Sequence, residues 1–314
     1  MRRRAFRSGD PGVLAEVVAR GLGCSREDAS TLVRRGAVYL RGRRQRDATL
    51  AVAAGTEVLV VLEEGGRSST APQTSPEPLR VLHEDAEVLA VDKPAGLPAQ
   101  PTPGGLRSLL LLASDHLGRE AGLVHRLDRD TSGVMVFGKS PAATSALAAS
   151  FRTGAARKQY LAVTAAGLPD AGTCTLRLAR DRTRPGRWVA RPREGLAAET
   201  RFRRLAATAE LALAGVWPRT GRTHQIRAHL AALGAPIAGD RLYGGPMKLQ
   251  GKDIGRSLLH AHVLVLPHPR TGTPLRLCAP LPEDIAPWFT ALETVPPEGA
   301  PELLTAPGSA DPRR

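Results

Sequence analysis

The densest group of polar and charged side chains in the chain lies in the segment LVHRLDRDTSG, residues 123–133. Its Asp, Thr, Ser and Gly at 130–133 are typical of a turn whose side chains hydrogen-bond to the nearby backbone. The apolar run at 134–137 follows at once and predicts a strand. Two interpretations are open at this point. The segment is either a charged surface turn that begins a strand, or a loop that carries function on a rigid strand.

Strand-like and helical stretches alternate on both sides of this segment without a strict βαβ order. Further apolar runs predict strands at 88–91, 160–163 and 263–266. Helical spacing predicts helices near 105–117, 141–151 and 223–233. Such mixing is typical of an α+β fold with a mixed, largely antiparallel sheet, which we expect over residues 81–295.

The first 50 residues differ from the rest in charge. They hold twelve arginines and five acidic residues, which is half of the net charge of +14. Apolar residues recur with helical spacing over 13–22, and Ser25 with Asp28 predicts the cap of a second helix. Two short strands would complete a compact module over residues 11–63. A solvated basic helical hairpin is the alternative.

Two segments have the composition of chain without a packed core. Residues 64–80, EGGRSSTAPQTSPEPLR, are rich in Gly, Ser and Pro and predict a flexible linker. Residues 296–314 have the same character and predict a disordered tail.

The composition narrows the class of protein. Hydrophobic residues make up 42% of the chain and charged residues 24%, which is typical of a globular protein with a real core. Of the 44 basic residues 39 are arginine, the residue best suited to bidentate phosphate and base contacts, although a GC-rich genome would also favour it. The excess of positive charge favours RNA or DNA as a partner.

The sequence argues against membrane-spanning, secreted and disulfide-rich proteins. No apolar run is long enough to span a bilayer, and the polar stretch 8–11 stands where a signal peptide would be apolar. Cys24, Cys174 and Cys278 lie far apart, which argues against a disulfide scaffold and against a cysteine zinc site. We expect a cytoplasmic monomer with no membrane partner.

A metal centre is the obvious alternative use for the polar residues. Five histidines could combine with Asp128 or Asp240: His125, His224, His229, His260 and His262. None of them stands in an HExxH arrangement, and paired ligands on one helix normally need one face. We expect no metal, and expect these histidines to bond to backbone or to RNA.

Further blocks recur along the chain in a recognisable order. They are DKPAGLP (92–98), KQYLA (158–162), TGRTHQIRAHL (220–230), GDRLYGG (239–245), LLHA (258–261), HP (268–269) and APLP (279–282). Together with residues 123–133 they resemble the RluA-type pseudouridine synthase family over about 80–288. One departure is Pro98-Ala99-Gln100-Pro101, where members often carry Val-His-Pro; this puts an auxiliary contact in doubt. Residues 11–62 resemble the S4 RNA-binding module.

The resemblance implies roles for individual residues. Asp128 would be the catalytic acid and Arg227 its ion-pair partner, while Tyr160 would stack on the target uracil. Arg126 would fill the space that the flipped base leaves, and Ile226 would pack at the pocket. Arg222 would be a further substrate-binding residue. The module would bind RNA through six arginines: Arg26, Arg34, Arg35, Arg41, Arg43 and Arg44.

Elementary chemistry is consistent with these roles. Conversion of uridine to pseudouridine breaks the N1–C1′ bond, turns the base and rejoins it through C5. Because no atoms are gained or lost, no cofactor and no second substrate are expected. One carboxylate can act as nucleophile or as base at the sugar, and a nearby cation keeps it ionised. The base must leave its stack first, which costs a few kcal/mol that pocket stacking offsets.

We therefore expect an RNA pseudouridine synthase that acts on large-subunit ribosomal RNA, with tRNA as an open alternative. Two rival functions remain. One is a non-catalytic RNA-binding or ribosome-assembly protein on the same fold. The other is a phosphodiesterase or glycosidase that uses Asp128 with a second carboxylate, for which Asp130 and Asp240 are the candidates.

Overall fold

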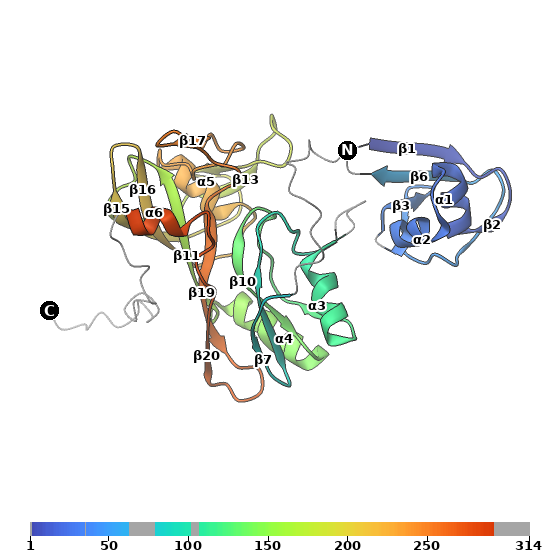
Figure 1. Cartoon of the computed structure of the whole chain (residues 1–314), viewed down its shortest axis with the longest axis horizontal. Helices are drawn as coiled ribbons and strands as arrows, with labels where there is room; N and C mark the ends of the chain where they lie inside the picture. The colour runs from blue at the N-terminus through green and yellow to red at the C-terminus, as the bar shows by residue number, and fades with distance from the viewer. Residues whose placement is uncertain (1, 35, 63–78, 102–106, 292–314) are drawn as a thin grey trace. The chain divides into compact units, whose positions relative to one another are not determined.

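The computed structural model describes residues 2–34, 36–62, 79–101 and 107–291 (Figure 1). The chain divides into two compact units: Met1–Pro78 with Pro98–Leu112, and Leu79–Leu97 with Ala113–Arg314. Most of the expected linker at 64–80 and the whole expected tail at 296–314 lie outside the described residues.

The first unit packs a pair of helices on a small antiparallel sheet. The helices are α1 (Leu14–Leu22) and α2 (Arg26–Arg34). The sheet has the strand order β1-β6-β3-β4: β1 (Arg2–Arg7), β6 (Glu57–Leu62), β3 (Val38–Leu40) and β4 (Arg43–Gln45). A two-stranded ribbon adds β2 (Gly12–Val13) and β5 (Ala51–Val52).

Local sequence accounts for both helices of this unit. Leu14, Val17 and Val18 recur on one face of α1 and are buried, as helical spacing requires. At the start of α2, the Ser25 hydroxyl accepts from the backbone N–H of Asp28 at 3.0 Å and donates to its carboxylate at 2.7 Å. The predicted cap is thereby confirmed.

Strand β1 lies before the predicted module and was not expected from the sequence. It pairs with β6 over its whole length, from Arg2 opposite Leu62 to Arg7 opposite Glu57. Phe6 packs against the core of the unit. Arginine occupies most of the other positions of the strand, so it lacks the apolar alternation by which a half-buried strand is detected.

The second unit is built on a ten-stranded sheet in which nearly all neighbours are antiparallel; only β10 and β19 pair in parallel. Along the sheet the order is β12 (Ala171–Cys174), β15 (Thr200–Ala207), β16 (Leu211–Pro218), β11 (Arg157–Ala165), β19 (Leu259–Pro267), β10 (Ser132–Gly138), β8 (Val88–Lys93) and β7 (Val81–Glu84). Two further strands extend it: β20 (Pro274–Cys278) beside β19, and β9 (Gly122–Leu123) beside β10. The predicted α+β class with a mixed, largely antiparallel sheet is confirmed.

Helices and short ribbons cover this sheet (Figure 1). The helices on it are α4 (Pro141–Thr153), α5 (Gln225–Ala232) and α6 (Ala286–Ala291); a further helix, α3 (Leu109–Leu117), has residues in both units. The ribbons are β13 (Arg177–Arg180) with β14 (Trp188–Arg191), and β17 (Lys248–Leu249) with β18 (Lys252–Asp253). Strands β8, β10 and β16 are buried on both faces, which is why they read as continuous apolar runs. Among the described residues no helix is long and apolar enough to cross a bilayer.

Candidate active site

Asp128 lies in the loop that connects β9 to β10. The backbone N–H of Thr131 donates to the Asp128 carbonyl at 3.1 Å and closes the turn before the strand. Gly133 pairs with Ala261 of β19 and has φ 112°, and a Cβ atom at this position would collide with the Ala261 carbonyl oxygen. Glycine is therefore required here, and the close approach of β19 fixes the loop that carries Asp128.

Arg227 comes from the first turn of α5 and makes contact with Asp128. Its Nη1 donates to Asp128 Oδ2 at 3.0 Å. The same guanidinium donates to Asp240 twice, from Nε at 2.6 Å and from Nη2 at 3.0 Å. Burial alone would lower the pKa of Arg227, but hydrogen bonds and charge from Asp240, and then from Asp128, raise it. One permanent cation thus lies between two carboxylates.

The two carboxylates differ in access to solvent. The Asp240 side chain is 1% exposed, whereas that of Asp128 is 29% exposed. Asp240 Oδ1 also accepts from the backbone N–H of Tyr243 at 3.3 Å, so this carboxylate is held from two sides. The Tyr243 ring covers the Arg227 guanidinium at 5.0 Å. Asp128 is the carboxylate that a substrate can reach, and Asp240 orients Arg227.

Tyr160 and Ile226 supply the apolar side of the site. Tyr160 lies on β11 at a bulge, where the pairing with β19 shifts between Gln159 and Tyr160. A bulge of this kind re-aims the side chain that follows it. Burial and the charge of Asp128 raise the pKa of the half-buried Tyr160 phenol. Ile226 is buried in the cluster on which Tyr160 packs.

Lys93, the last residue of β8, supports the loop that carries Asp128. It is 0% exposed, and its amine donates to the carbonyls of Pro94 and Arg129, both at 2.8 Å. Burial lowers the pKa of Lys93 to about 7. The DKP block at 92–94 therefore connects the end of β8 to Arg129, the residue that follows Asp128.

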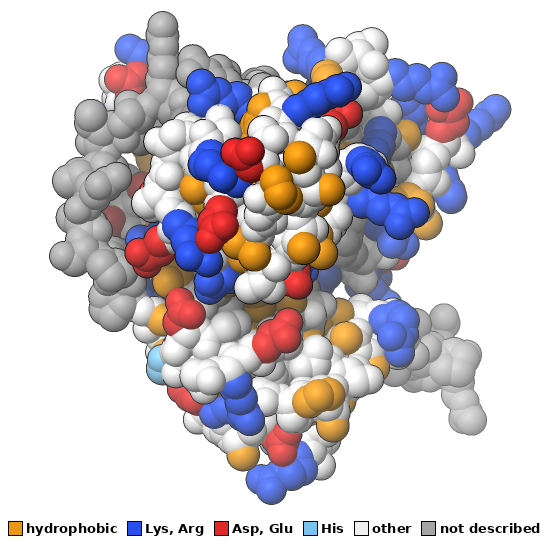
Figure 2. Space-filling model, turned by 90° about the vertical axis from the view of Figure 1, so that its right-hand side faces the viewer, with side chains coloured by type: hydrophobic (Ala, Val, Ile, Leu, Met, Phe, Trp, Pro, Cys, Tyr) orange, Lys and Arg blue, Asp and Glu red, His pale blue; other side chains and the backbone are white. Residues whose placement is uncertain are grey.

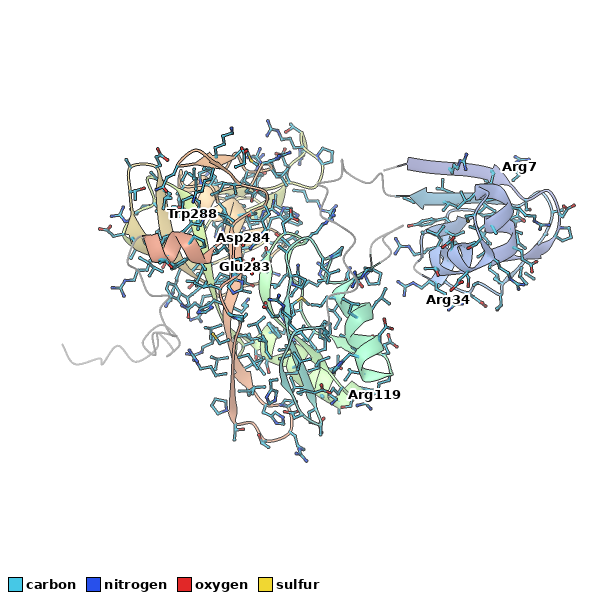
Figure 3. The ribbon with its side chains drawn as sticks, in the orientation of Figure 1. Arg7, Arg34, Arg119, Glu283, Asp284 and Trp288 are labelled. Atoms are coloured by element: carbon cyan, nitrogen blue, oxygen red, sulfur yellow. The ribbon has the colours of Figure 1, made fainter. Side chains whose placement is uncertain are left out.

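A second anchor comes from the C-terminal part of the unit. Arg256 donates from Nη1 to the Asp130 carbonyl at 3.0 Å, which holds the loop two residues beyond Asp128. Asp284 binds the same guanidinium at 2.5 and 2.7 Å (Figure 3 labels Asp284 near the start of α6). This ion pair connects the loop to the segment that leads into α6.

The histidines that suggested a metal centre bond mostly to protein groups. His125 accepts from the Val136 N–H at 3.1 Å, and burial lowers its pKa to about 3. His229 bonds to Thr200 and to the Leu176 carbonyl, and His260 bonds to Ser132. His262 lies 2.9 Å from the Ala279 carbonyl.

His224 is the histidine nearest to Asp128. Its Nε2 lies 3.9 Å from Asp128 Oδ2, and its Nδ1 lies 3.1 Å from the Tyr243 hydroxyl. Burial lowers the pKa of His224 in spite of the nearby carboxylate. His224 also adopts a left-handed backbone conformation, with φ 54°, immediately before α5. Arg227 is therefore the cation that faces Asp128 at neutral pH.

The remaining candidate residues lie at the surface. Arg126 and Arg222 are exposed, and Arg222 Nε donates to the Ala197 carbonyl at 3.1 Å. In the first unit the candidate RNA-binding arginines that the structure describes are also exposed: Arg26, Arg34, Arg41, Arg43 and Arg44. Arg35 lies outside the described residues. Figure 2 shows Lys and Arg side chains at many places on the face that it draws.

The chain is similar to known proteins over most of its length. The model of the RNA pseudouridylate synthase family matches residues 87–232. Ribosomal large subunit pseudouridine synthase D of Xanthomonas campestris pv. campestris is 40% identical over 294 residues, 85% of this chain and 85% of that protein. The chain belongs to the RNA pseudouridylate synthase family. As a pseudouridylate synthase it is an isomerase that acts on RNA.

Other relatives of this pseudouridylate synthase agree. Ribosomal large subunit pseudouridine synthase D of Nitrosomonas europaea is 34% identical over 256 residues, 77% of this chain and 73% of that protein. Among solved structures, human RNA pseudouridylate synthase domain containing 4 is 30% identical, with a TM-score of 0.57, over 68% of this chain and 93% of that chain.

The structure of this synthase brings Asp128 and Arg227 together and places Tyr160 near the Asp128 charge, with Ile226 packed beside it. Sequence reasoning missed the supporting residues. Asp240 was considered only as a metal ligand or a second acid, yet its place in the GDRLYGG block marked it as part of the site. Lys93 stood in the DKP block without an assigned role, and no local signal indicated Arg256.

Proposed function

We propose that this synthase isomerises uridines in large-subunit ribosomal RNA, with Asp128 as the carboxylate that acts at the sugar. The observation that carries the proposal is the Arg227 guanidinium, which holds Asp128 while Asp240 holds Arg227. This arrangement presents one carboxylate, partly open to solvent, beside the half-buried ring of Tyr160. Nucleophilic attack at C1′ and proton abstraction from the sugar are both open to it.

The surrounding residues have roles in taking up the base. Tyr160 offers an aromatic face on which a flipped uracil stacks, and Ile226 supports it. Arg126 is exposed and lies two residues before Asp128. Its side chain can therefore enter the RNA stack when the base leaves. Arg222 contacts the RNA beside α5. The ribosomal substrate is supported by the two relatives named above, which are large-subunit enzymes by name.

The glycosidase alternative requires a second free carboxylate, and it loses one of its two candidates, Asp240. Asp240 is almost completely buried, and both of its carboxylate oxygens accept hydrogen bonds from Arg227. It therefore has no free position from which to act on a sugar or a water molecule.

The N-terminal residues 11–63 are proposed as an S4-like module that adds RNA affinity, and residues 81–295 as the catalytic domain. The assignment of the module is supported by its two helices and by five exposed arginines, two of which lie in α2 and three in the segment that follows it. Phosphate contacts of this kind raise affinity without reading sequence.

The experiment that tests the function is a map of pseudouridine in cellular RNA from cells with and without the gene. The proposal expects one or more sites to disappear from the large-subunit ribosomal RNA. Loss of sites from tRNA alone would mean that tRNA is the substrate, while the proposed isomerisation of uridine would stand. Unchanged maps, together with no isomerisation of transcribed ribosomal RNA by the purified protein, would contradict the proposal.

A further inference from the structure

The hairpin of β13 and β14 is the most basic part of the second unit. Residues 177–193 contain seven arginines and one acidic residue, a net charge of +6 in 17 residues. The first 50 residues carry +7 of the total of +14. Outside these two segments the chain is therefore almost neutral, so the charge of the second unit is concentrated on one ribbon.

The two faces of the ribbon differ in what they contact. Leu178, Trp188 and Ala190 pack with Tyr243 and Ala228 in one apolar cluster, so this face lies against α5. On the other face Arg177 is directly opposite Arg191, and both side chains are exposed. Like charges directly opposite each other destabilise a strand pair, so local stability does not explain this pair.

The single acidic residue of the hairpin is already engaged. Asp181 Oδ1 accepts from the backbone N–H of Thr183 at 2.8 Å and from its hydroxyl at 2.7 Å, which shapes the turn. Its other oxygen lies 3.5 Å from Arg187. Six exposed arginines then make no ion pair with any residue that the structure describes: Arg177, Arg180, Arg182, Arg184, Arg191 and Arg193.

The hairpin is joined directly to the site that holds Asp128. The backbone N–H of Trp188 donates to the Tyr243 hydroxyl at 3.0 Å, and the Arg187 guanidinium lies 5.5 Å from the Tyr243 ring centre. The same ring covers Arg227, the partner of Asp128. One aromatic side chain therefore separates the basic ribbon from the charged centre of the site.

We propose that the β13–β14 hairpin binds the phosphate backbone of the substrate RNA beside the target uridine; this rests on the proposed function. Unpaired arginines on a ribbon next to the site match a polyanion, and guanidinium groups bind phosphate bidentately. Contacts to the phosphates that flank the target hold the strand in register while the base leaves its stack. The hairpin sets RNA affinity and position, and Asp128 performs the chemistry.

The test removes three hairpin charges and compares them with three charges elsewhere. The hairpin variant is Arg182→Gln/Arg184→Gln/Arg191→Gln, and the control is Arg119→Gln/Arg270→Gln/Arg276→Gln. All six side chains are exposed, none donates a side-chain hydrogen bond to a described residue, and both variants change net charge equally. Arg119 lies at the end of the second unit away from β13 (Figures 1 and 3).

Two quantities are measured with large-subunit ribosomal RNA transcribed in vitro: the dissociation constant at several salt concentrations and the single-turnover rate. For the hairpin variant we expect binding about tenfold weaker, a slope of log K against log salt smaller by about 2, and an unchanged rate at saturating RNA. The control should stay within about twofold of the wild type in binding.

Two outcomes would overturn the proposal. Equal binding and equal slopes for both variants would mean that the hairpin charges face something other than RNA. A lower saturating rate with unchanged binding would mean that the hairpin only supports the fold of the site. If the wild type binds the RNA without isomerising it, the proposed function fails, and the binding comparison still decides the role of the hairpin.

Discussion

Asp240 binds the Arg227 guanidinium through both carboxylate oxygens, at 2.6 and 3.0 Å, and leaves Nη1 for Asp128. A planar guanidinium held at one edge by two hydrogen bonds keeps a fixed direction at the other nitrogen. The position of the Asp128 carboxylate therefore depends on a residue that the substrate does not touch. Asp240 is a positioning residue in this account.

Replacing Asp240 by Asn tests that role. The amide keeps one acceptor but loses the charge, so Arg227 is held by weaker bonds. Hydrogen bonds to charged groups contribute about 1.5–3 kcal/mol, which predicts a saturating single-turnover rate lower by about ten- to a hundredfold. RNA affinity should change little. Asp170→Asn is the control, because it removes the carboxylate that pairs with Arg204 at an exposed position. A wild-type rate in the Asp240 variant would argue against the positioning role.

Removal of Arg227 should cost stability as well as activity. Arg227→Met leaves the buried Asp240 carboxylate without its partner, for which we expect a loss of about 3–5 kcal/mol in the free energy of unfolding. In Arg227→Met/Asp240→Asn the buried charge is gone, so much of the stability should return while isomerisation stays absent. Urea unfolding and single-turnover assays on the three proteins measure this. Equal stabilities of the single and double variants would show that the pair is not coupled.

The sequence predicted the central strands but not the supporting contacts. Strands β8 and β10 were predicted from continuous apolar runs, because a strand buried on both faces needs them, and shorter runs of this kind predicted β11 and β19. Strand β1 was missed because arginines interrupt its apolar pattern. The pairing of Asp128 with Arg227 joins residues 99 positions apart, which no local periodicity encodes; only the family resemblance suggested it. The resemblance also included Asp240, through the GDRLYGG block, but it assigned no role to this residue.

Lys93 should make stability depend on pH in the alkaline range. Its pKa is lowered to about 7 in the folded protein, whereas an unfolded lysine keeps its proton to about pH 10.4. Between these values the unfolded state binds more protons, so the free energy of unfolding should rise with pH. Lys93→Met should lack this rise, and the exposed Lys252→Met should keep it. Urea unfolding at about pH 7 and about pH 9.5 provides the comparison. Parallel behaviour of wild type and Lys93→Met would contradict the burial of a titrating amine.

The arginines of the first unit should contribute to RNA affinity without changing the chemical step. Arg41→Gln/Arg43→Gln removes two exposed charges, so the salt dependence of binding to transcribed ribosomal RNA should become shallower by about 1 to 2 in slope. The saturating rate should stay at the wild-type value. Arg270→Gln/Arg276→Gln is the matched control in the second unit. Identical slopes for the two variants would mean that these arginines face solvent or another partner.

The most direct test of the account is the single-turnover isomerisation rate of Asp128→Asn on RNA labelled with tritium at C5 of uridine. Formation of the C5–C1′ bond displaces that hydrogen, so release of tritium into water reports the reaction itself. The amide has nearly the shape of the acid, so the variant should fold and bind RNA with wild-type affinity while releasing no tritium above background. Substantial tritium release by the pure Asn variant would contradict the assignment of Asp128 as the residue that performs the chemistry.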